Sequence, residues 1–414
     1  MLQPARGTED FYPTEKAVEL AIFEKLRRLA LAWGYGEIES PAFEHLHLLE
    51  RKTGPEIREQ IFLLEKRGAE QLGLRFDMTV PAVRMFIARQ KELPKPVRWF
   101  YADKMWRYEA PQKARAREFY QFGVELFGSA KPQADAELLE LLAAAFAALG
   151  LGSDDVVIKI NNRKLLIGLL DFVPAAKLEE LLRLIDKSRR LSPGEFDREL
   201  ARLGVGATRI KEILATRALD ELERGKLNEL ATEGLGELKA VFALLDSVTR
   251  AFVELDLSIA RGLAYYTGTV YEAFDRQGRL RALAGGGRYD DLIELLGGSS
   301  TPASGWAIGY LPLTLFLAEK GLLPKPATGP DYLIAPVSEL LWGEAQAIAG
   351  RLRAKGEVVA VDVSGRGLSG QLDYASAIGA RKVIIVGSRE LEQGFVTVRD
   401  MTSGREEKVK LTEL

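Results

Sequence analysis

Cysteine is absent from this 414-residue chain, and histidine occurs only twice. The lack of cysteine excludes disulfide bonds, thiolate nucleophiles and thiolate-bound metals. The two histidines, His45 and His47, stand two residues apart without a third ligand beside them, so we assign no metal site to protein ligands. Histidine is therefore a poor candidate for a general base, and any catalysis must depend on arginine, lysine, tyrosine or carboxylate side chains.

A long apolar run is also absent. The longest one, residues 141–151, is well short of the ~20 residues that cross a bilayer, so we interpret it as a core helix and expect no membrane partner. The first residues, MLQPARGTEDFYP, contain no basic segment followed by an apolar one. This pattern predicts a cytoplasmic protein.

Neither sign of charge is in excess. The chain has 57 basic and 59 acidic residues, a net charge of −2, and 47% hydrophobic residues. These proportions exclude disorder and a uniformly basic surface for nucleic acid, although a local basic patch stays open. The length favours two or three domains.

The pattern of elements predicts an α+β fold. Segments rich in aromatic and β-branched residues indicate an antiparallel sheet, and a leucine-rich, strand-poor region interrupts it. A Pro- and Gly-rich linker then precedes alternating strands and helices, typical of a small α/β domain with a partly parallel sheet. The predicted domains are a discontinuous first domain (1–162 and 250–322), a helical insertion (163–249) and a C-terminal domain (328–414).

Arginines gather in the segment WRYEAPQKARAREFYQFGVE, residues 106–125. Arg107, Arg115 and Arg117 fall on two strand ends and the loop between them, so we expect them to converge on one anion. The loop has no glycine-rich nest, which excludes phosphate binding of the P-loop type.

One face of the following strand reads as a pocket wall. Phe119, Gln121, Gly123 and Glu125 are two residues apart and therefore share a face. An aromatic ring, an amide and a carboxylate, with the space left by Gly123, form a surface that suits a polar ligand. The alternative, a sheet with a charged outer face, stays open.

Asp77 and Thr79 in LRFDMT form a weaker motif. A carboxylate and a hydroxyl two residues apart suit an ammonium group, but the same residues also cap helices.

The segment RGLAYYTGTVYEAF, residues 261–274, combines a fixed positive charge at Arg261 with two tyrosines. Tyr265 and Tyr266 are expected to alternate faces, so that one hydroxyl points into a pocket. Downstream, AGGGRYDDL adds three glycines and Tyr289, although a glycine triplet alone is usually a flexible turn.

Five segments in this order resemble the histidyl-tRNA synthetase family of class II aminoacyl-tRNA synthetases. They are GTEDFYP, LRFDMTVPAVR, WRYEAPQ with REFYQFGVE, RGLAYYTGTVYE and GGGRYD. The resemblance spans nearly the whole chain, and the last two segments are specific to the histidine enzymes and their paralogues. It implies a class II synthetase-type antiparallel sheet flanked by helices, a homodimer formed through the first helix and strand, and an anticodon-binding C-terminal domain.

The resemblance also implies a reaction in two steps. Histidine and ATP, with Mg²⁺ as part of the substrate complex, give histidyl-adenylate and pyrophosphate, and histidine is then transferred to tRNA(His). For ATP, the family motif assigns the α-phosphate to Arg107 and Arg261, the adenine to Glu109 and Phe119, and the γ-phosphate to Arg115. Arg107 and Arg261 would be the catalytic residues.

For histidine, the family motif assigns the ammonium group to Asp77 and Thr79 and the carboxylate region to Gln121 and Arg107. Glu125 and Tyr266 would bind the imidazole nitrogens. The remaining residues that would line this pocket are Tyr265, Tyr289 and Arg261.

Two positions depart from the family pattern. Ala264 replaces an aspartate before the paired tyrosines, and Pro312 stands where many members have an arginine that contacts ATP. These departures keep a rival open, the regulatory, histidine-binding paralogue of ATP phosphoribosyltransferase, which does not aminoacylate. The retained Arg107, Arg115 and Arg261 and the full C-terminal domain favour the synthetase.

Overall fold

The computed structural model describes residues 2–53, 55–111, 114–261 and 265–414. Its backbone contacts divide into two compact units, a larger one that includes Leu20–Leu323 and a smaller one that includes Pro324–Leu414. Within these described ranges, no helix combines the length and the apolar character that a membrane crossing requires.

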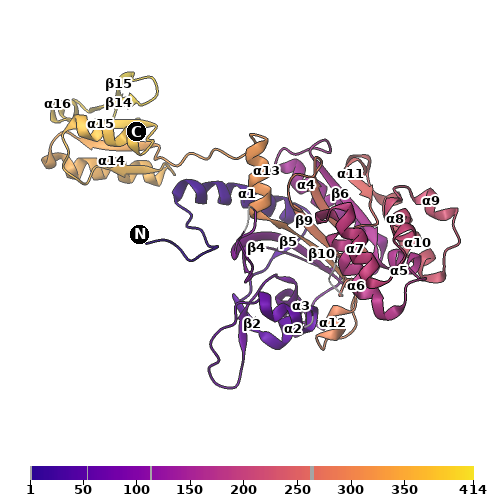
Figure 1. The fold of residues 1–414 in the computed structure, drawn as a ribbon. Helices are drawn as coiled ribbons and strands as arrows, with labels where there is room; N and C mark the ends of the chain where they lie inside the picture. Colours follow the sequence, from indigo (N-terminus) through magenta and orange to yellow (C-terminus); the bar gives the residue numbers. More distant parts are fainter. Residues whose placement is uncertain (1, 54, 112–113, 262–264) are drawn as a thin grey trace. The chain divides into compact units, whose positions relative to one another are not determined.

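The larger unit is built on an eight-stranded sheet in the order β1-β4-β5-β10-β9-β8-β6-β7 (Figure 1). The six strands from β4 to β6 are antiparallel, which confirms the predicted fold class, whereas β1 and β7 join the two edges in parallel. The strands are β1 (Gly36–Glu37), β4 (Val97–Trp106), β5 (Glu118–Phe127), β6 (Val156–Asn162), β7 (Val253–Leu255), β8 (Thr269–Asp275), β9 (Ala284–Arg288) and β10 (Ala303–Gly309), with a separate pair β2 (Phe43–His45) and β3 (Leu72–Leu74).

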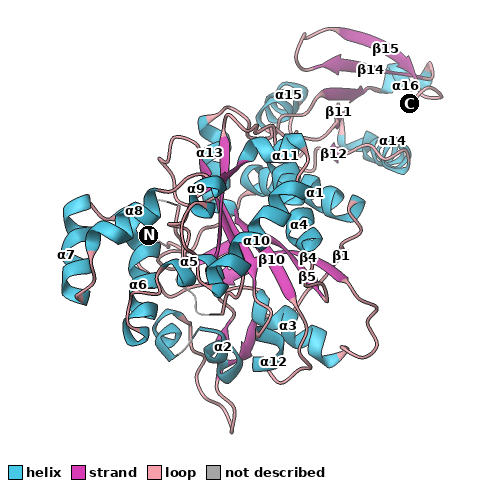
Figure 2. Cartoon of the chain, turned by 90° about the vertical axis from the view of Figure 1, so that its right-hand side faces the viewer, coloured by secondary structure: helices cyan, strands magenta, loops and turns pink. Residues whose placement is uncertain are grey.

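Helices cover one face of this sheet (Figure 2). The indole N–H of Trp306 on β10 donates to the carbonyl of Leu138 at 2.8 Å, which fixes α4 (Pro132–Ala148) against the sheet centre. Phe122 on β5 points to the same face, with its ring 6.1 Å from that of Trp306. Because side chains alternate along a strand, Gln121 and Glu125 must point to the opposite face. This unit also contains α13 (Tyr310–Glu319) and the part of α1 (Pro13–Ala32) that begins at Leu20.

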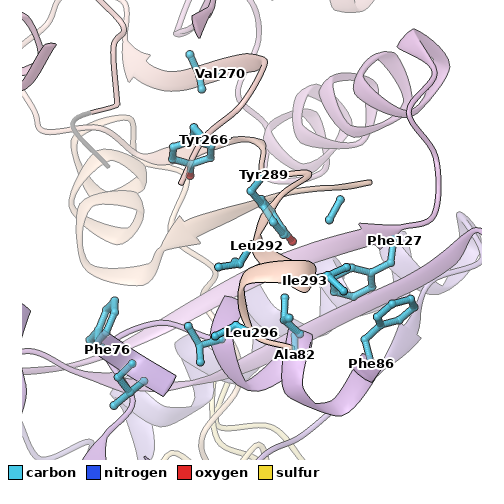
Figure 3. Packing of buried hydrophobic residues seen from close by; sticks show 14 of the residues in the cluster. Phe76, Ala82, Phe86, Phe127, Tyr266, Val270, Tyr289, Leu292, Ile293 and Leu296 are labelled. Atoms are coloured by element: carbon cyan, nitrogen blue, oxygen red, sulfur yellow. The ribbon is translucent and has the colours of Figure 1, made fainter. Parts of the chain in front are cut away.

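On the opposite face, a hydrophobic cluster closes one end of the sheet. The ring of Phe86 on α3 (Thr79–Ala88) stacks on Phe127 of β5 with centroids 4.7 Å apart. Tyr266 and Tyr289 belong to the same cluster (Figure 3). The polar tyrosines therefore lie where the apolar packing ends. The short elements of this region are α2 (Leu46–Thr53), η1 (Pro55–Gln60) and α12 (Leu292–Leu295).

All regular elements within residues 163–249 are helices. Leu181, Ile185 and Leu200 are fully buried in a hydrophobic cluster of their own. Helix α7 begins with a capping box between Ser192 and Glu195, which satisfies backbone N–H groups at its start. The predicted boundaries of this insertion stay a prediction. The helices are α5 (Arg163–Leu169), α6 (Ala175–Lys187), η2 (Ser188–Arg190), α7 (Pro193–Leu203), α8 (Ala207–Ala215), α9 (Leu219–Glu223), α10 (Glu229–Leu244) and α11 (Ser247–Phe252).

The smaller unit is an α/β domain with a five-stranded sheet in the order β12-β11-β13-β14-β15. The first three strands are parallel and the last two antiparallel, as predicted for a partly parallel sheet. Separate clusters on its two faces include Ile348 of α14 and Ala375 of α15. The elements are β11 (Tyr332–Pro336), η3 (Glu339–Leu341), α14 (Trp342–Ala354), β12 (Val359–Val361), α15 (Leu368–Ala377), β13 (Lys382–Val386), α16 (Ser388–Glu392), β14 (Phe395–Asp400) and β15 (Glu406–Lys410).

A glycine substitution tests the close packing of the central strands. A Cβ atom at Gly286 on β9 would lie 2.3 Å from the carbonyl oxygen of Gly305 and 2.6 Å from Cβ of Trp306. We expect Gly286→Ala to lower the free energy of unfolding of the larger unit by about 1–3 kcal/mol, measured by denaturant titration. The control is Gly236→Ala on α10, where a Cβ meets nothing within 4 Å. It should raise stability by about 0.5–1 kcal/mol. Equal effects of the two variants would contradict the packing described for β9.

Candidate active site

A cavity of about 310 Å³ opens on the same face of the sheet as the hydrophobic cluster, over the part of that face that the cluster does not cover. Strands β5, β9 and β10 form its floor, and the segment before β8, the turn before β9 and the start of α13 contribute walls. The structure brings to this cavity all twelve residues to which the family motif assigns a role. They are Asp77, Thr79, Arg107, Glu109, Arg115, Phe119, Gln121, Glu125, Arg261, Tyr265, Tyr266 and Tyr289.

The wall on β5 follows the predicted period of two. Phe119, Gln121 and Glu125 all line the cavity, and Glu125 is only 3% exposed. Its carboxylate fits because Gly305 is opposite it in the sheet register: a Cβ there would lie 2.2 Å from Oε2 of Glu125. The pairing of β5 with β10 therefore creates the space that an enclosed carboxylate needs.

Glu125 is held by a tyrosine. The hydroxyl of Tyr289, at the end of β9, donates a hydrogen bond to Oε2 of Glu125. Burial, reinforced by the neighbouring Glu125 carboxylate, raises the pKa of Tyr289 well above its ordinary value. Tyr289 thus keeps its proton and remains a donor to the carboxylate at neutral pH.

The paired tyrosines do not alternate faces as the sequence predicted. Both Tyr265 and Tyr266 line the cavity, and their ring centroids are 4.4 Å apart. The prediction was wrong because β8 begins only at Thr269, so the two-residue period of a strand does not apply to them. The ring of Tyr265 also meets that of Tyr289 edge-on at 6.2 Å.

Arg261 enters the cavity from a strained backbone. Its φ of 45° lies in the left-handed region, which is uncommon outside glycine. The guanidinium pairs with Glu272, and its Nη2 donates to the hydroxyl of Tyr266 at 3.1 Å. Gly285 makes room for this group, since a Cβ there would lie 2.4 Å from Nη1.

The environment of Arg261 keeps it charged. Burial alone would lower its pKa, but the Tyr266 hydroxyl and the Glu272 carboxylate outweigh burial and hold the pKa of Arg261 well above its ordinary value. Its buried Nε has no hydrogen-bond partner among the described residues. A buried donor without an acceptor costs free energy, so the network is incomplete until a ligand supplies one.

Arg107 faces the same cavity from the end of β4. Its Nε donates to the carbonyl of Phe76 at 3.1 Å, and its guanidinium carbon lies 5.2 Å above the ring of Phe119. Burial lowers the pKa of Arg107; Asp77 opposes this effect, whereas the positive charge of Arg261 adds to it. Two guanidinium groups that repel each other across a cavity are arranged for an anion.

The basic loop contributes only one of its two arginines. Arg115 lines the cavity and forms an ion pair with Glu109. Arg117 does not line the cavity: its guanidinium stacks on Tyr108 and donates to the carbonyl of Glu109 at 3.2 Å. The predicted convergence of three arginines was wrong for Arg117, because its guanidinium is engaged by the Tyr108 ring and the Glu109 carbonyl instead.

Two polar groups lie at the edge formed by α3. Oδ1 of Asp77 accepts from the backbone N–H of Thr79 at 3.1 Å, as in an Asx turn, and both side chains also line the cavity. Across from them, Oε1 of Gln121 is buried without a hydrogen-bond donor among the described residues. A ligand with several N–H donors would complete this edge.

Sequence reasoning missed several lining residues. Tyr101 on β4 and Arg281 before β9 both line the cavity, but neither belongs to a motif that points to a ligand. Pro312, the second departure from the family pattern, lies in the cavity wall at the start of α13. Ala264, the other departure, lies outside the described residues, as does Gly262.

Comparison with known proteins gives one consistent family. The model of the family described as histidyl-tRNA synthetase matches residues 7–313, and that described as anticodon binding domain matches residues 331–414. Proteins named histidine–tRNA ligase from Pyrococcus horikoshii and Halorubrum lacusprofundi are each 38% identical over 100% of this chain, covering 98% and 96% of their own lengths.

Solved structures agree with this match. A histidyl-tRNA synthetase from Nostoc sp. PCC 7120 superimposes with a TM-score of 0.83 at 27% identity, covering 99% of this chain and 96% of its own. A chain from Bacillus halodurans, described as an ATP phosphoribosyltransferase regulatory subunit/histidyl-tRNA synthetase, reaches 0.77 at 24% identity over 93% of this chain and 98% of its own. At that identity, the second likeness concerns the fold alone.

The pairing of Glu125 with Tyr289 can be tested by removing one hydroxyl. We expect Tyr289→Phe to lower the free energy of unfolding by ~1–3 kcal/mol, because it removes the hydroxyl that donates to an enclosed carboxylate. The matched control is Tyr271→Phe: the Tyr271 hydroxyl is buried with no partner among the described residues, so its removal should be neutral or slightly stabilising. Denaturant titration measures both. The description of this pair fails if the two substitutions have the same effect.

Proposed function

Because this chain belongs to the histidyl-tRNA synthetase family, we propose that it is a ligase that activates histidine with ATP and transfers it to tRNA(His). One observation supports this most strongly. Arg107 and Arg261 face one cavity whose far end contains an enclosed carboxylate, Glu125, held by a tyrosine. That combination suits a substrate with an anionic centre next to a small ring that donates a hydrogen bond.

Histidine fits the cavity by its three polar groups. Its ammonium group meets Asp77 and Thr79. Oε1 of Gln121, which has no donor among the residues that the structure describes, is an acceptor that an ammonium also satisfies. The imidazole reaches Glu125, which accepts from a ring N–H, with Tyr266 beside it. A side chain without such a donor would leave Glu125 without that hydrogen bond, which gives selectivity against other amino acids.

In the first step, the histidine carboxylate attacks the α-phosphorus of ATP. A bond forms between carboxylate oxygen and phosphorus, the bond to the bridging oxygen of the β-phosphate breaks, and pyrophosphate leaves. Negative charge grows on the α-phosphate oxygens. Arg261 and Arg107 stabilise it from fixed positions, so that no solvent has to reorganise. This step requires no proton transfer from the protein.

The remaining groups position ATP. Phe119 and Glu109 hold the adenine, one by its ring face and the other by a carboxylate that accepts from the exocyclic amine. Arg115, now paired with Glu109, is placed for the γ-phosphate. Mg²⁺ enters with ATP as part of the substrate and neutralises phosphate charge. In the described part of the chain, no group of three or more carboxylate or histidine side chains could hold a metal ion.

In the second step, a ribose hydroxyl of tRNA attacks the carbonyl of histidyl-adenylate and AMP leaves. The C-terminal domain, which matches the anticodon-binding family over residues 331–414, is the part that would bind the anticodon arm.

We further propose a cytoplasmic homodimer formed through the first helix and strand. Exposed Leu31 on α1 and Phe43 on β2, at 57% and 51%, support an apolar contact in that region.

The regulatory paralogue remains a second candidate because of one residue. Pro312 lies in the cavity wall, where many family members have an arginine for ATP. The retained Arg107, Arg115 and Arg261 all line the same cavity and favour ATP chemistry over histidine sensing alone. Binding of histidine without any exchange between ATP and pyrophosphate would select the regulatory function instead.

Substitution of Arg261 tests the activation step. We expect the purified chain to catalyse histidine-dependent exchange of pyrophosphate into ATP, and Arg261→Ala to reduce the rate by ~10²–10³-fold, the usual cost of a charge-stabilising donor. The control, Arg276→Ala, removes an exposed arginine whose ion pair with Glu254 lies outside the cavity. Undiminished exchange in Arg261→Ala would exclude this residue from the mechanism.

Substitution of Glu125 tests amino-acid recognition. Glu125→Gln keeps the shape but removes the charge that accepts the imidazole N–H, so the KM for histidine should rise by ~10-fold or more while the KM for ATP stays nearly constant. Glu118→Gln is the matched control on the same strand, since Glu118 faces away and pairs with Lys104. A parallel rise in both KM values would point to a distorted site instead of lost recognition.

A further inference from the structure

We propose that Arg281 binds the β- and γ-phosphates of ATP, the two groups that leave together as pyrophosphate. The proposal rests on the function proposed above. Arg281 belongs to no motif that the sequence analysis singled out, yet it lines the cavity together with the other three arginines.

The backbone fixes Arg281 beside the start of α13. It lies in the turn between β8 and β9, two residues before Leu283. The N–H of Leu283 donates to the carbonyl of Ala273 at 2.7 Å, and the carbonyl of Leu283 accepts from the N–H of Gly309, the residue before α13, at 3.0 Å. The turn is therefore bound both to β8 and to the N-terminal end of α13. Half-buried Arg281 shares this wall with Leu311 and Pro312.

Arg281 supplies the positive charge in a wall whose other described residues are uncharged. Leu311 and Pro312 provide no charge, and Pro312 has no backbone N–H to donate to an anion. Among the described residues of the wall formed by the turn and the first turn of α13, Arg281 is the cationic one. A polyphosphate that passes along this wall would otherwise meet only uncharged side chains, those of Tyr310, Leu311 and Pro312 among them.

The position of the other groups directs the phosphates toward this wall. Arg107 and Arg261 lie where the proposed function puts the α-phosphate, and the end beyond them is closed by Glu125, Tyr289 and the hydrophobic cluster. The β- and γ-phosphates must therefore extend away from the imidazole end, between Arg115 and Arg281. A guanidinium can bind two phosphate oxygens at once, which suits the leaving pyrophosphate. In this arrangement a turn residue supplies the positive charge that Pro312 does not.

Direct binding tests Arg281 without relying on catalysis. Calorimetric titration with pyrophosphate and Mg²⁺, and separately with ATP and Mg²⁺, compares the full-length chain with Arg281→Ala and Arg281→Lys. We expect Arg281→Ala to lower the affinity for both ligands by ~10-fold or more. The affinities of Arg281→Lys should lie between those of the parent and Arg281→Ala, because lysine keeps the charge but cannot bind two phosphate oxygens in the bidentate way of a guanidinium. Histidine affinity should change less than about twofold, which excludes general damage to the site.

The turn provides a matched control. Arg279→Ala removes a 53% exposed arginine two residues earlier, whose partners are Asp275 and Glu319 and which does not line the cavity. It should leave pyrophosphate and ATP affinities unchanged. Equal losses in Arg279→Ala and Arg281→Ala, or no loss in Arg281→Ala, overturn the proposal, and so does a parent chain that binds neither ligand.

A second-site variant separates binding from folding. In the Arg281→Ala background, Pro312→Arg returns a guanidinium to the same wall from α13, and we expect it to recover at least part of the lost ATP affinity. The absence of any recovery, with histidine binding intact, counts against a charge role for this wall. Arg281→Ala can lower ATP affinity even if the parent chain shows no histidine-dependent exchange of pyrophosphate into ATP. That result would support the phosphate site at Arg281 and contradict the proposed activation reaction.

Discussion

Two like charges held across one cavity are the constraint on which the rest of the site depends. Arg107 and Arg261 repel each other, and burial further disfavours the charge of each. The fold offsets this cost with Asp77 beside Arg107 and with Glu272 and Tyr266 beside Arg261. These partners keep both groups charged, but among the described residues none accepts a hydrogen bond from the Nε of Arg261. An incoming phosphate relieves the repulsion and completes the hydrogen bonding, so the free cavity already has the charge that the transition state needs.

Sheet register is what allows this arrangement. Glycines on two neighbouring strands leave space that any other residue would fill: Gly305 for the Glu125 carboxylate and Gly285 for the Arg261 guanidinium. Because these two glycines lie on adjacent strands β10 and β9, one sheet positions both the imidazole end and the phosphate end of the cavity. Specificity and chemistry are therefore coupled through the backbone and do not depend on loops alone.

Much of the site was predictable from the two-residue period of side chains along a strand. The rest depends on which strands pair and in which register. The period of two along β5 placed Phe119, Gln121 and Glu125 on one face. The same rule failed for Tyr265 and Tyr266, because they precede the strand that was expected to contain them. Arg281 and Tyr101 could not be found, since their approach to the cavity depends on which strands pair and not on neighbouring residues. For the same reason the parallel pairing of the edge strands β1 and β7 was not predicted, while the central antiparallel strands and the partly parallel C-terminal sheet were predicted from hydrophobic alternation and strand–helix order.

The central claim is that the guanidinium pair recognises the phosphate joined to histidine. Calorimetry with histidinol and with its AMP ester, a stable analogue of histidyl-adenylate, tests this most directly, because the ester adds the α-phosphate without allowing reaction. The account predicts that the ester binds at least ~100-fold more tightly than histidinol, as expected for a mimic of a tightly held intermediate, and that Arg261→Ala removes most of this advantage. Equal affinities for the two compounds, or an advantage that survives Arg261→Ala unchanged, would contradict it.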